Sequence, residues 1–284
     1  MVRNVGLNVD TIRLSGSLKN LRKELELLRS LEINLAEIPP AGLHFIFGGK
    51  LVFSKLKEVL EVIRDFPFEY TIHMPDPVNF AINREEDFEI ASAVVEFAKI
   101  IDAKVIVYHC GSQPGIEGFD LEVQRLSLLA DIIGDKNIFI GIENLDHDIE
   151  WTLNICKNVG KEKVKLTIDV GHLFLHCNGD VSKFIEQLEL GLPYAVEIHF
   201  HDNFGKPANL CWKDIGEKIW FAYLYGVGDL HLPLGMGVLP LEITFELINK
   251  YFDGYVVIEI NDLNRFQEDI ANSIRLIRKN CFCG

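Results

Sequence analysis

The feature that most constrains the fold of this chain is an eightfold alternation of apolar strand-like runs with helix-like segments. The runs are rich in Val, Ile and Leu, and the segments that follow them repeat apolar residues at helical spacing. The predicted strands are 4–9, 33–38, 70–74, 104–109, 138–144, 163–170, 195–201 and 255–260. The predicted helices are 17–31, 53–64, 85–101, 119–133, 148–158, 180–189, 240–251 and 264–279. Apolar strands that alternate with helices are typical of a parallel sheet covered by helices.

Eight strand–helix units in 284 residues predict an α/β fold, a single (β/α)₈ barrel domain that spans residues 1–284. An open, doubly wound sheet is the alternative. It is less favoured because no G-x-G-x-x-G motif opens the first unit. No low-complexity linker marks a domain boundary.

The charge of the chain limits its partners. Lys and Arg number 28 and Asp and Glu number 42, which gives a formal net charge of −14. Such a chain has no general attraction to nucleic acid or to an anionic membrane. The sequence has neither a signal peptide nor an 18-residue apolar run, and its six cysteines form no C-x-x-C pair. We therefore expect a cytoplasmic protein with free thiols and no membrane partner.

Metal-type ligands stand at or just after the ends of the predicted strands, and two more, Asp229 and His231, follow in the segment after the seventh strand. In a (β/α)₈ barrel these strand ends carry the active site. The candidate ligands are His73, His109, Glu143, Asp169, His172, His199, Asp229, His231 and Glu259. A buried carboxylate is costly unless it is paired or bound to a cation. Because carboxylates and imidazoles together suit Zn²⁺ or Mn²⁺, the sequence predicts a divalent metal centre.

Other residues near the strand ends are candidates for roles other than metal binding. His201 alternates with His199, so the two side chains should point to opposite faces, and we expect His201 to be structural. Glu37 ends the second strand and is a candidate for substrate binding or for a structural acid. Lys206 and Trp212 are candidate substrate-binding residues in the insert 204–226. This insert suits a lid over a small substrate, a dimer contact or a packed helix.

Seven blocks of the chain resemble, in the same order, those of the xylose isomerase-like barrel superfamily. The blocks are TIHMP, VYHCGS, GIENL, TIDVGH, EIHFHDN, GDLHLPLGMG and VVIEI. This superfamily contains many sugar and sugar-phosphate isomerases and epimerases. It also contains endonuclease IV, the zinc enzyme of AP endonuclease family 2 that cuts DNA at abasic sites. The resemblance covers nearly the whole chain and implies the same barrel fold.

The two branches of the superfamily imply different metal sets, of one to three ions. Resemblance to endonuclease IV implies three zinc ions. The first would be bound by His73, His109 and Glu143, the second by Glu143, Asp169, His199 and Glu259, and the third by His172, Asp229 and His231. Resemblance to the epimerases implies a single metal on the second set, with Glu143 and Glu259 also moving protons.

The residues in these blocks favour the isomerase and epimerase branch. The seventh strand ends in HFHDN, whereas endonuclease IV has HLND. The chain also departs from the ketose epimerases, because the Arg they place after this strand is missing and only Lys206 is nearby. Three Zn²⁺ against the four carboxylates would leave a positive centre that can hold a phosphate, whereas one ion would leave a negative one. The number of metal ions therefore discriminates between the branches.

The leading hypothesis is a metal-dependent isomerase or epimerase of a sugar or sugar phosphate. The metal would hold a carbonyl and its neighbouring hydroxyl, and Glu143 and Glu259 would move the proton, with His172 as a third catalytic candidate. The alternative is zinc-dependent phosphodiester hydrolysis at abasic sites in DNA. A metal-binding barrel without catalysis is the third hypothesis. We expect a small-molecule partner first and nucleic acid second, and homo-oligomerisation is left open.

Overall fold

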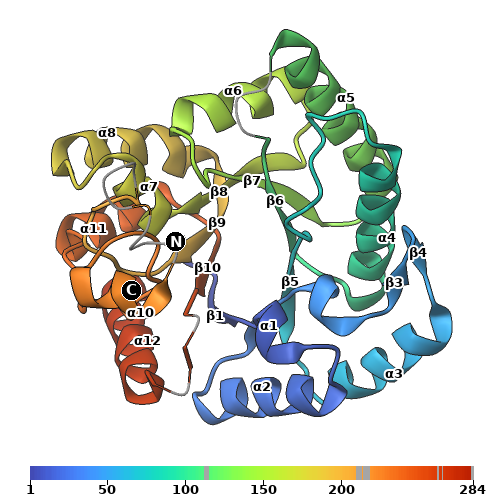
Figure 1. The fold of residues 1–284 in the computed structure, drawn as a ribbon, viewed down its shortest axis with the longest axis horizontal. Coiled ribbons are helices and arrows are strands. Elements are labelled where there is room, and N and C mark those ends of the chain that lie inside the picture. The colour runs from blue at the N-terminus through green and yellow to red at the C-terminus, as the bar shows by residue number, and fades with distance from the viewer. Residues whose placement is uncertain (112–114, 209–212, 214–217, 261, 264, 283–284) are drawn as a thin grey trace. The chain divides into compact units, whose positions relative to one another are not determined.

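The computed structural model describes the whole chain except residues 112–114, 209–212, 214–217, 261, 264 and 283–284. The barrel strands are β1 (Asn4–Asn8), β2 (Leu35–Ile38), β5 (Glu69–His73), β6 (Val105–His109), β7 (Phe139–Glu143), β8 (Val164–Asp169), β9 (Ala195–Phe200) and β10 (Tyr255–Ile258). They are hydrogen-bonded into a closed barrel in the order β1-β10-β9-β8-β7-β6-β5-β2 (Figure 1). This order confirms the predicted (β/α)₈ class and excludes the open sheet.

The helices that alternate with these strands agree with the sequence prediction to within three residues at each end. They are α2 (Leu18–Ser30), α3 (Phe53–Ile63), α4 (Glu85–Ile101), α5 (Ile116–Ile133), α6 (Ile149–Val159), α8 (Val181–Gly191), α11 (Leu241–Tyr251) and α12 (Gln267–Cys281).

Several short elements were not predicted from the sequence. They are α1 (Thr11–Leu14), the 3₁₀ turns η1 (Pro40–Leu43) and η2 (Leu192–Tyr194), the strands β3 (Ile46–Phe47) and β4 (Lys50–Leu51), and α7 (Val170–His176). Of these, α7 carries the candidate ligand His172. The short helix α10 (Ile219–Tyr225) lies in the insert 204–226, for which a helix was one of three alternatives.

The described chain forms two compact units. Unit 1 contains Met1–Val5, Asn144–Trp151 and Thr167–Gly284, and unit 2 contains Gly6–Glu143 and Thr152–Leu166. The assignment of residues 1–284 to one domain stays a prediction.

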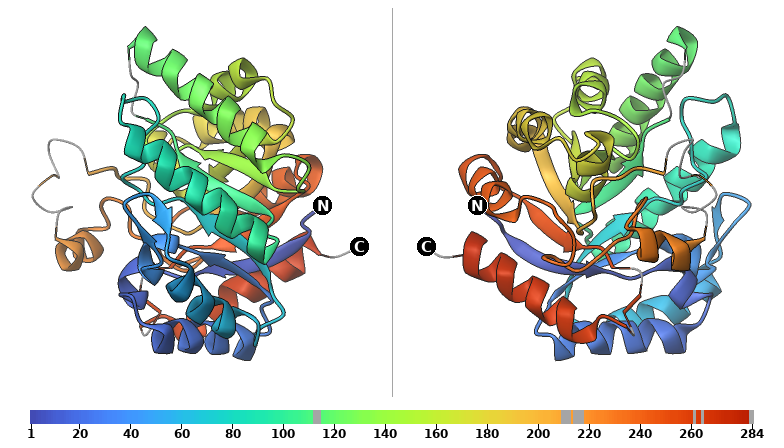
Figure 2. Two further views of the ribbon diagram at one scale, coloured as in Figure 1. Left: turned by 90° about the vertical axis from the view of Figure 1, so that its right-hand side faces the viewer. Right: turned by 60° about the vertical axis from the view of Figure 1, so that its left-hand side comes forward.

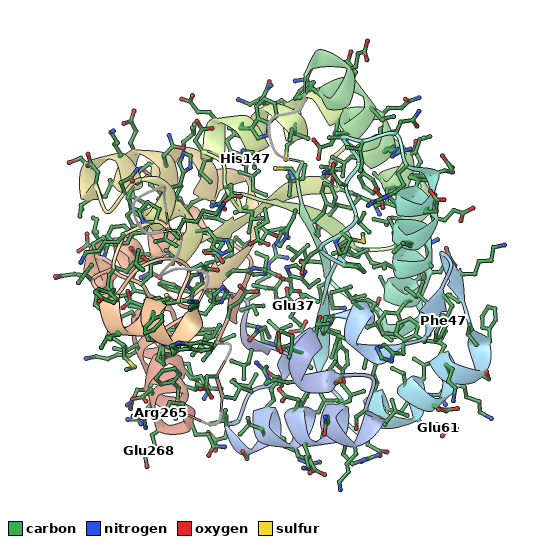
Figure 3. All side chains as sticks on the ribbon, in the orientation of Figure 1. Glu37, Phe47, Glu61, His147, Arg265 and Glu268 are labelled. Carbon is green, nitrogen blue, oxygen red and sulfur yellow. The ribbon has the colours of Figure 1, made fainter. Side chains whose placement is uncertain are left out.

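In unit 2, four strands run parallel in the order β2-β5-β6-β7 (Figure 1). Their register pairs His109 of β6 directly with Glu143 of β7, which brings two candidate ligands together. Helices α4 and α5 pack against each other beside these strands. Two residues of this unit that Figure 3 labels differ in burial, because the Glu37 side chain is buried, whereas Phe47 of β3 is 57% exposed.

In unit 1, β9 and β10 run parallel, with His199 of β9 beside Val257 of β10. Helix α11 packs on both α8 and α12, as Figure 2 shows. Helix α8 begins at its N-cap Asp180, whose side chain accepts hydrogen bonds from the backbone N–H groups of Ser182 and Lys183. The strand pair itself is buried almost throughout. Every helix in the described part of the chain is too short or too polar to cross a bilayer.

Candidate metal centre

The turn from β8 to α7 explains why an apolar strand ends in an acid. Asp169 is the last residue of β8 and the N-cap of α7, and its Oδ1 accepts the backbone N–H of His172 at 2.7 Å. Asn144 fixes the Asp169 backbone twice, because its Oδ1 accepts the Asp169 N–H at 2.8 Å and its Nδ2 donates to the Asp169 carbonyl at 3.0 Å. Asp169 and His172 are therefore held side by side, with Oδ2 and Nδ1 3.4 Å apart.

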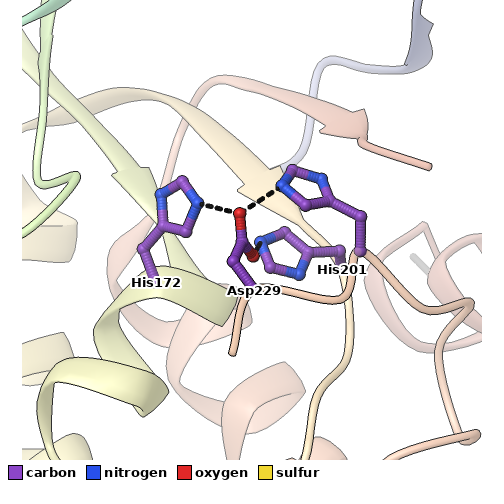
Figure 4. A group of neighbouring side chains, drawn as sticks. His172, His201 and Asp229 are labelled. Carbon is purple, nitrogen blue, oxygen red and sulfur yellow. Dashed lines mark hydrogen bonds and ion pairs between the residues drawn. The ribbon is translucent and has the colours of Figure 1, made fainter. Parts of the chain in front are cut away.

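A cluster of three imidazoles surrounds the carboxylate of Asp229 in unit 1. Oδ2 of Asp229 lies 2.7 Å from Nε2 of His231 and 3.1 Å from Nε2 of His172. Oδ1 lies 3.6 Å from Nε2 of His201. Figure 4 shows the His172 and His201 rings directed at this carboxylate. One ligand atom from each of the four residues lies within 4.8 Å of the others, which is close enough for one metal ion.

His201 is placed differently from the sequence expectation. β9 ends at Phe200, so the alternation of side chains that made His201 point away from His199 does not extend to it. The His201 side chain is fully buried in the Asp229 cluster, and its ring stacks on that of His231 with centroids 4.0 Å apart. The signal in the sequence was the polar pair Asp202–Asn203, which marks the end of the strand one residue earlier than expected.

The charges of this cluster are strongly coupled. Desolvation by itself would raise the pKa of the Asp229 carboxyl, but the facing His231 and His172 hold this pKa well below its usual range. Desolvation would likewise lower the pKa of His231, but Asp229 and Glu259 outweigh it and raise this pKa to about 9. A metal ion would have to replace the proton on His231, so metal and proton compete for the cluster.

Glu259 and His199 form a second pair of metal-type ligands in unit 1. Glu259 follows β10, and its Oε1 lies 3.2 Å from Nδ1 of His199. On the other side of the ring, Nε2 of His199 lies 3.2 Å from Oε1 of Glu197. Glu197 and His199 are fully buried and Glu259 is nearly so. An imidazole that donates Nε2–H to Glu197 keeps the lone pair of Nδ1 on the side of Glu259, which suits a ligand pair.

A third group of ligands lies in unit 2. His109 Nε2 is 3.0 Å and His73 Nε2 is 3.7 Å from Oε2 of the fully buried Glu143. The opposite nitrogens of both rings face the exposed Asp76, with Nδ1 of His109 3.5 Å and Nδ1 of His73 3.9 Å from its Oδ1. Carboxylates and backbone carbonyls at this position fix the tautomer of metal-binding histidines, and for His73 the carbonyl of Met74, 2.9 Å from Nδ1, is the nearer partner. The sequence analysis did not identify Asp76, although its place in HMPDP, three residues after His73, was visible.

Asp202 is a buried residue that directly follows His201 and was assigned no role from the sequence. Its carboxylate accepts the backbone N–H groups of Asn203, Gly235, Gly237 and Leu239 at 2.8–3.1 Å. Burial raises the pKa of this carboxyl, and these four N–H groups oppose the rise. Asp202 thereby holds the segment 235–239 next to the end of β9.

The predicted substrate-binding residues lie in different settings. Glu37 in β2 has a carboxylate oxygen within 4.8 Å of a ring nitrogen of His73. Lys206 is exposed, and its carbonyl accepts the N–H of Gly228 at 2.7 Å. Trp212 lies outside the described residues. The second metal set, in which Glu143 joins Asp169, His199 and Glu259, combines residues of the two units and stays a prediction.

The donor atoms within each unit fit a divalent metal. Three imidazoles and one carboxylate converge in unit 1, and two imidazoles and one carboxylate converge in unit 2. In the part of the chain that is described, neither ring nitrogen of the buried His201 makes a hydrogen bond, although Nε2 faces Oδ1 of Asp169 at 3.1 Å. Buried polar atoms are normally satisfied, so this pair of nitrogens favours a ligand that is bound from outside the chain.

The sequence of the chain decides its family. Residues 25–280 match the family model described as a xylose isomerase-like TIM barrel. The chain belongs to this family. The resemblance of the seven sequence blocks is therefore confirmed.

Relatives of this xylose isomerase-like barrel include one curated protein. An uncharacterized protein of Methanocaldococcus jannaschii is 28% identical over 219 residues, which are 70% of this chain and 78% of that protein.

Solved structures with the same fold include named epimerases. A D-tagatose 3-epimerase-like protein has a TM-score of 0.70 at 22% identity, covering 98% of this chain and 96% of its own. The D-psicose 3-epimerase of Clostridium cellulolyticum H10, solved with D-tagatose, has a TM-score of 0.71 at 11% identity, covering 98% and 99%. The IOLI protein, solved with a binding zinc atom, has a TM-score of 0.65 at 17% identity, covering 98% and 96%. At these identities the structures establish the fold that this xylose isomerase-like barrel shares with them.

Proposed function

We propose that this protein is a metal-dependent isomerase or epimerase that moves a proton next to the carbonyl of a sugar or sugar phosphate. The observation that carries the proposal is the position of Glu259 between two imidazoles. Its Oε1 lies 3.2 Å from Nδ1 of His199, and its Oε2 lies 3.7 Å from Nδ1 of His231. A nearly buried carboxylate in this setting suits a group that accepts and returns a proton.

Each residue around Glu259 has its own proposed role. Glu197 orients the His199 ring from behind, which keeps Nδ1 directed toward the side of Glu259. Asp169 orients His172 through the N-cap of α7. The resemblance assigns Glu143 as the second carboxylate that handles a proton, and we keep that assignment as part of the proposal.

A divalent metal suits the proposed roles of these carboxylates and imidazoles. The proposed ligands are Glu143, Asp169, His199 and Glu259, with Zn²⁺ or Mn²⁺ as the ion. When bound, the metal would supply a Lewis acid that stabilises negative charge on the substrate oxygen.

The class of substrate rests on relatives as well as on residues. Solved structures with this fold are named as epimerases of D-tagatose and D-psicose, which supports a sugar. The fold alone would not, because it hosts many chemistries. The exposed Lys206 could bind a hydroxyl or a phosphate at the rim, and Glu37 and Trp212 remain proposed substrate-binding residues.

The test is exchange of a substrate hydrogen with solvent deuterium, followed by NMR, across a panel of ketoses and their phosphates. Glu259→Gln keeps the size of the side chain but removes the base, so exchange should fall by about 10²–10⁴-fold. Glu246→Gln changes an exposed acid of α11 and is the matched control. Exchange at the wild-type rate in Glu259→Gln would exclude Glu259 as the base.

A second candidate function is phosphodiester hydrolysis at abasic sites. The observation that favours it is the number of ligands, because the His73–His109–Glu143 group and the Asp229 group provide more donors than one ion needs. The net charge of −14 argues against DNA as a partner. We expect weak or absent nicking of an abasic-site duplex, measured against an intact duplex and with a chelator. Strong chelator-sensitive nicking specific to the abasic site would make this function the leading one.

A further inference from the structure

We propose that His201 is a fourth protein ligand that closes the metal site of His172, Asp229 and His231, so that the metal bound there is structural. This inference does not depend on the proposed sugar chemistry. It assigns a role to a histidine that neither the alternation of side chains nor the resemblance to endonuclease IV includes among the ligands.

The four donors lie at spacings close to those of a tetrahedral site. Zinc bonds to nitrogen and oxygen of about 2.0–2.1 Å place neighbouring donors of a tetrahedron about 3.3 Å apart. The distances from the Asp229 oxygens to the ring nitrogens of His231, His172 and His201 are 2.7, 3.1 and 3.6 Å. All four donors lie within 4.8 Å of one another, so small side-chain shifts would bring them around one ion.

The His201 ring is built into the site. Its side chain has no exposed surface, and neither of its ring nitrogens makes a hydrogen bond with the described residues. Nε2 instead faces two carboxylates, Asp169 at 3.1 Å and Asp229 at 3.6 Å. Gly171 leaves the space that the ring fills, because a Cβ at position 171 would overlap the ring.

Backbone ties fix the three segments that carry the ligands. The end of β9 pairs with the loop after α10, because Asp202 and Leu232 exchange two backbone hydrogen bonds of 2.7 and 3.0 Å. The Asn203 side chain donates to the carbonyl of Gly171 at 2.9 Å, which ties β9 to the start of α7. The ligands His201, His231 and His172 are each one residue away from one of these ties. The site is therefore assembled by the fold before a metal arrives.

The backbone at His231 indicates that the direction of its ring matters. His231 has a φ of 45°, a left-handed conformation that is strained for a residue with a side chain. Such strain persists where the surrounding structure imposes it. Here the Asp202–Leu232 pairing on one side and Asp229 on the other impose it.

The number of ligands decides the role of the metal. Catalytic zinc sites keep three protein ligands and an open position, whereas structural sites have four protein ligands. Three ligands from His172, Asp229 and His231 would leave an open position, and His201 occupies it. A closed site would join the start of α7, the end of β9 and the loop after α10, and would carry no substrate.

The first experiment uses the full-length metal-free protein loaded with one equivalent of Co²⁺. The closed site should fill first and give the strong visible absorption of tetrahedral Co²⁺. His201→Gln should weaken this absorption and lower the Co²⁺ affinity at least about 10-fold, because water replaces a ligand. His176→Gln, an exposed histidine on α7, is the matched control and should change neither.

Two results would overturn the proposal. The first is an unchanged spectrum and affinity in folded His201→Gln. The second does not require the variant: X-ray absorption of the wild-type protein with one equivalent of Zn²⁺ that gives five- or six-coordination would exclude a closed site. Neither of these two measurements involves a sugar. If the wild-type protein gives the tetrahedral Co²⁺ spectrum but shows no deuterium exchange with any sugar, that result contradicts only the proposed function.

Discussion

The carboxylate of Asp202 is in close contact with the backbone of Gly237. Oδ2 of Asp202 accepts the N–H of Gly237 at 2.9 Å, and a Cβ at position 237 would overlap Oδ1 of Asp202 and the carbonyl of Asn203. Because of this close approach, one buried carboxylate accepts hydrogen bonds from four backbone N–H groups in two segments. The pair ties the end of β9 to the segment after the Asp229 cluster.

Asp202→Asn should therefore destabilise the protein by about 2–4 kcal/mol, because an amide has one acceptor oxygen and turns donors toward N–H groups. Urea unfolding of the metal-free protein measures this change. Asp180→Asn is the control, since Asn caps a helix as well as Asp does, and its cost should be near zero. Equal costs for the two variants would contradict the anchoring role of Asp202.

Asp76→Asn should weaken metal binding at the His73–His109–Glu143 group by about 10–100-fold. The reason is that the carboxylate lies 3.5 Å from Nδ1 of His109 and favours Nε2 of this ring as the ligand, whereas Nδ1 of His73 already bonds to the Met74 carbonyl at 2.9 Å. Zn²⁺ titration with a competing chelator measures the affinity. Asp102→Asn, an exposed acid paired with Lys104 in the same unit, should have no effect. Unchanged affinity in Asp76→Asn would assign Asp76 to the solvated surface.

Glu122 should make stability depend on pH. It is fully buried in α5, and its Oε1 accepts the Tyr108 hydroxyl at 2.8 Å and the Gly111 N–H at 2.9 Å. Burial raises its pKa above the unfolded value of about 4.3. The folded protein then holds the proton more tightly, so the stability gained is complete below the unfolded pKa and is lost as pH rises through the folded pKa.

The measurement compares the wild-type protein with Glu122→Gln, which does not titrate at this position. The difference in unfolding free energy should move against the wild type as pH rises from 4 to 8, by up to about 1.4 kcal/mol per pH unit. Glu117→Gln, an exposed acid of the same helix, should give a flat difference. A flat difference for Glu122→Gln as well would mean that its pKa is not raised by folding.

Removal of metal should lower the thermal stability of the purified protein. A metal that binds the folded state and not the unfolded state stabilises the folded state by mass action. The midpoint of a thermal melt should fall after chelator treatment and return when Zn²⁺ is added back. No metal by elemental analysis, together with no shift of the midpoint, would contradict the metal centre.

The chain should unfold as one domain. If residues 1–284 form a single domain, circular dichroism and tryptophan fluorescence should give coincident denaturant transitions. Two separate transitions would instead assign units 1 and 2 to domains that unfold independently.

The fold could be predicted from the sequence because its signals are local. Continuous apolar runs such as 104–109 belong to strands that are buried on both faces, and helix α4 shows its apolar period over its whole length. The family followed from blocks of adjacent residues. The short helix α7 was missed because it begins directly after β8, and its N-cap Asp169 was interpreted only as a ligand.

The candidate site was predicted where a ligand stands at a strand end, and missed where its position depends on distant backbone. His201 was assigned a structural role from the alternation of side chains along a strand that was expected to reach residue 201, but β9 ends at Phe200. Asp202 accepts hydrogen bonds from N–H groups that follow it by 33 to 37 residues, so no local sequence pattern predicts these contacts. Asp76 lies near His109 and His73 only in the folded chain, and the direction of their rings is not visible in a sequence.

The contact between Gly171 and His201 links two positions that lie 30 residues apart in the chain. Any side chain at position 171 would need the volume that the imidazole occupies, so the two positions cannot vary independently during evolution. Relatives that keep a histidine at the position of His201 are expected to keep glycine at the position of Gly171. Relatives that carry a larger residue there should have a smaller residue in place of the histidine. This pair of positions is therefore an evolutionary signature by which members of the family with the fourth imidazole can be recognised from sequence.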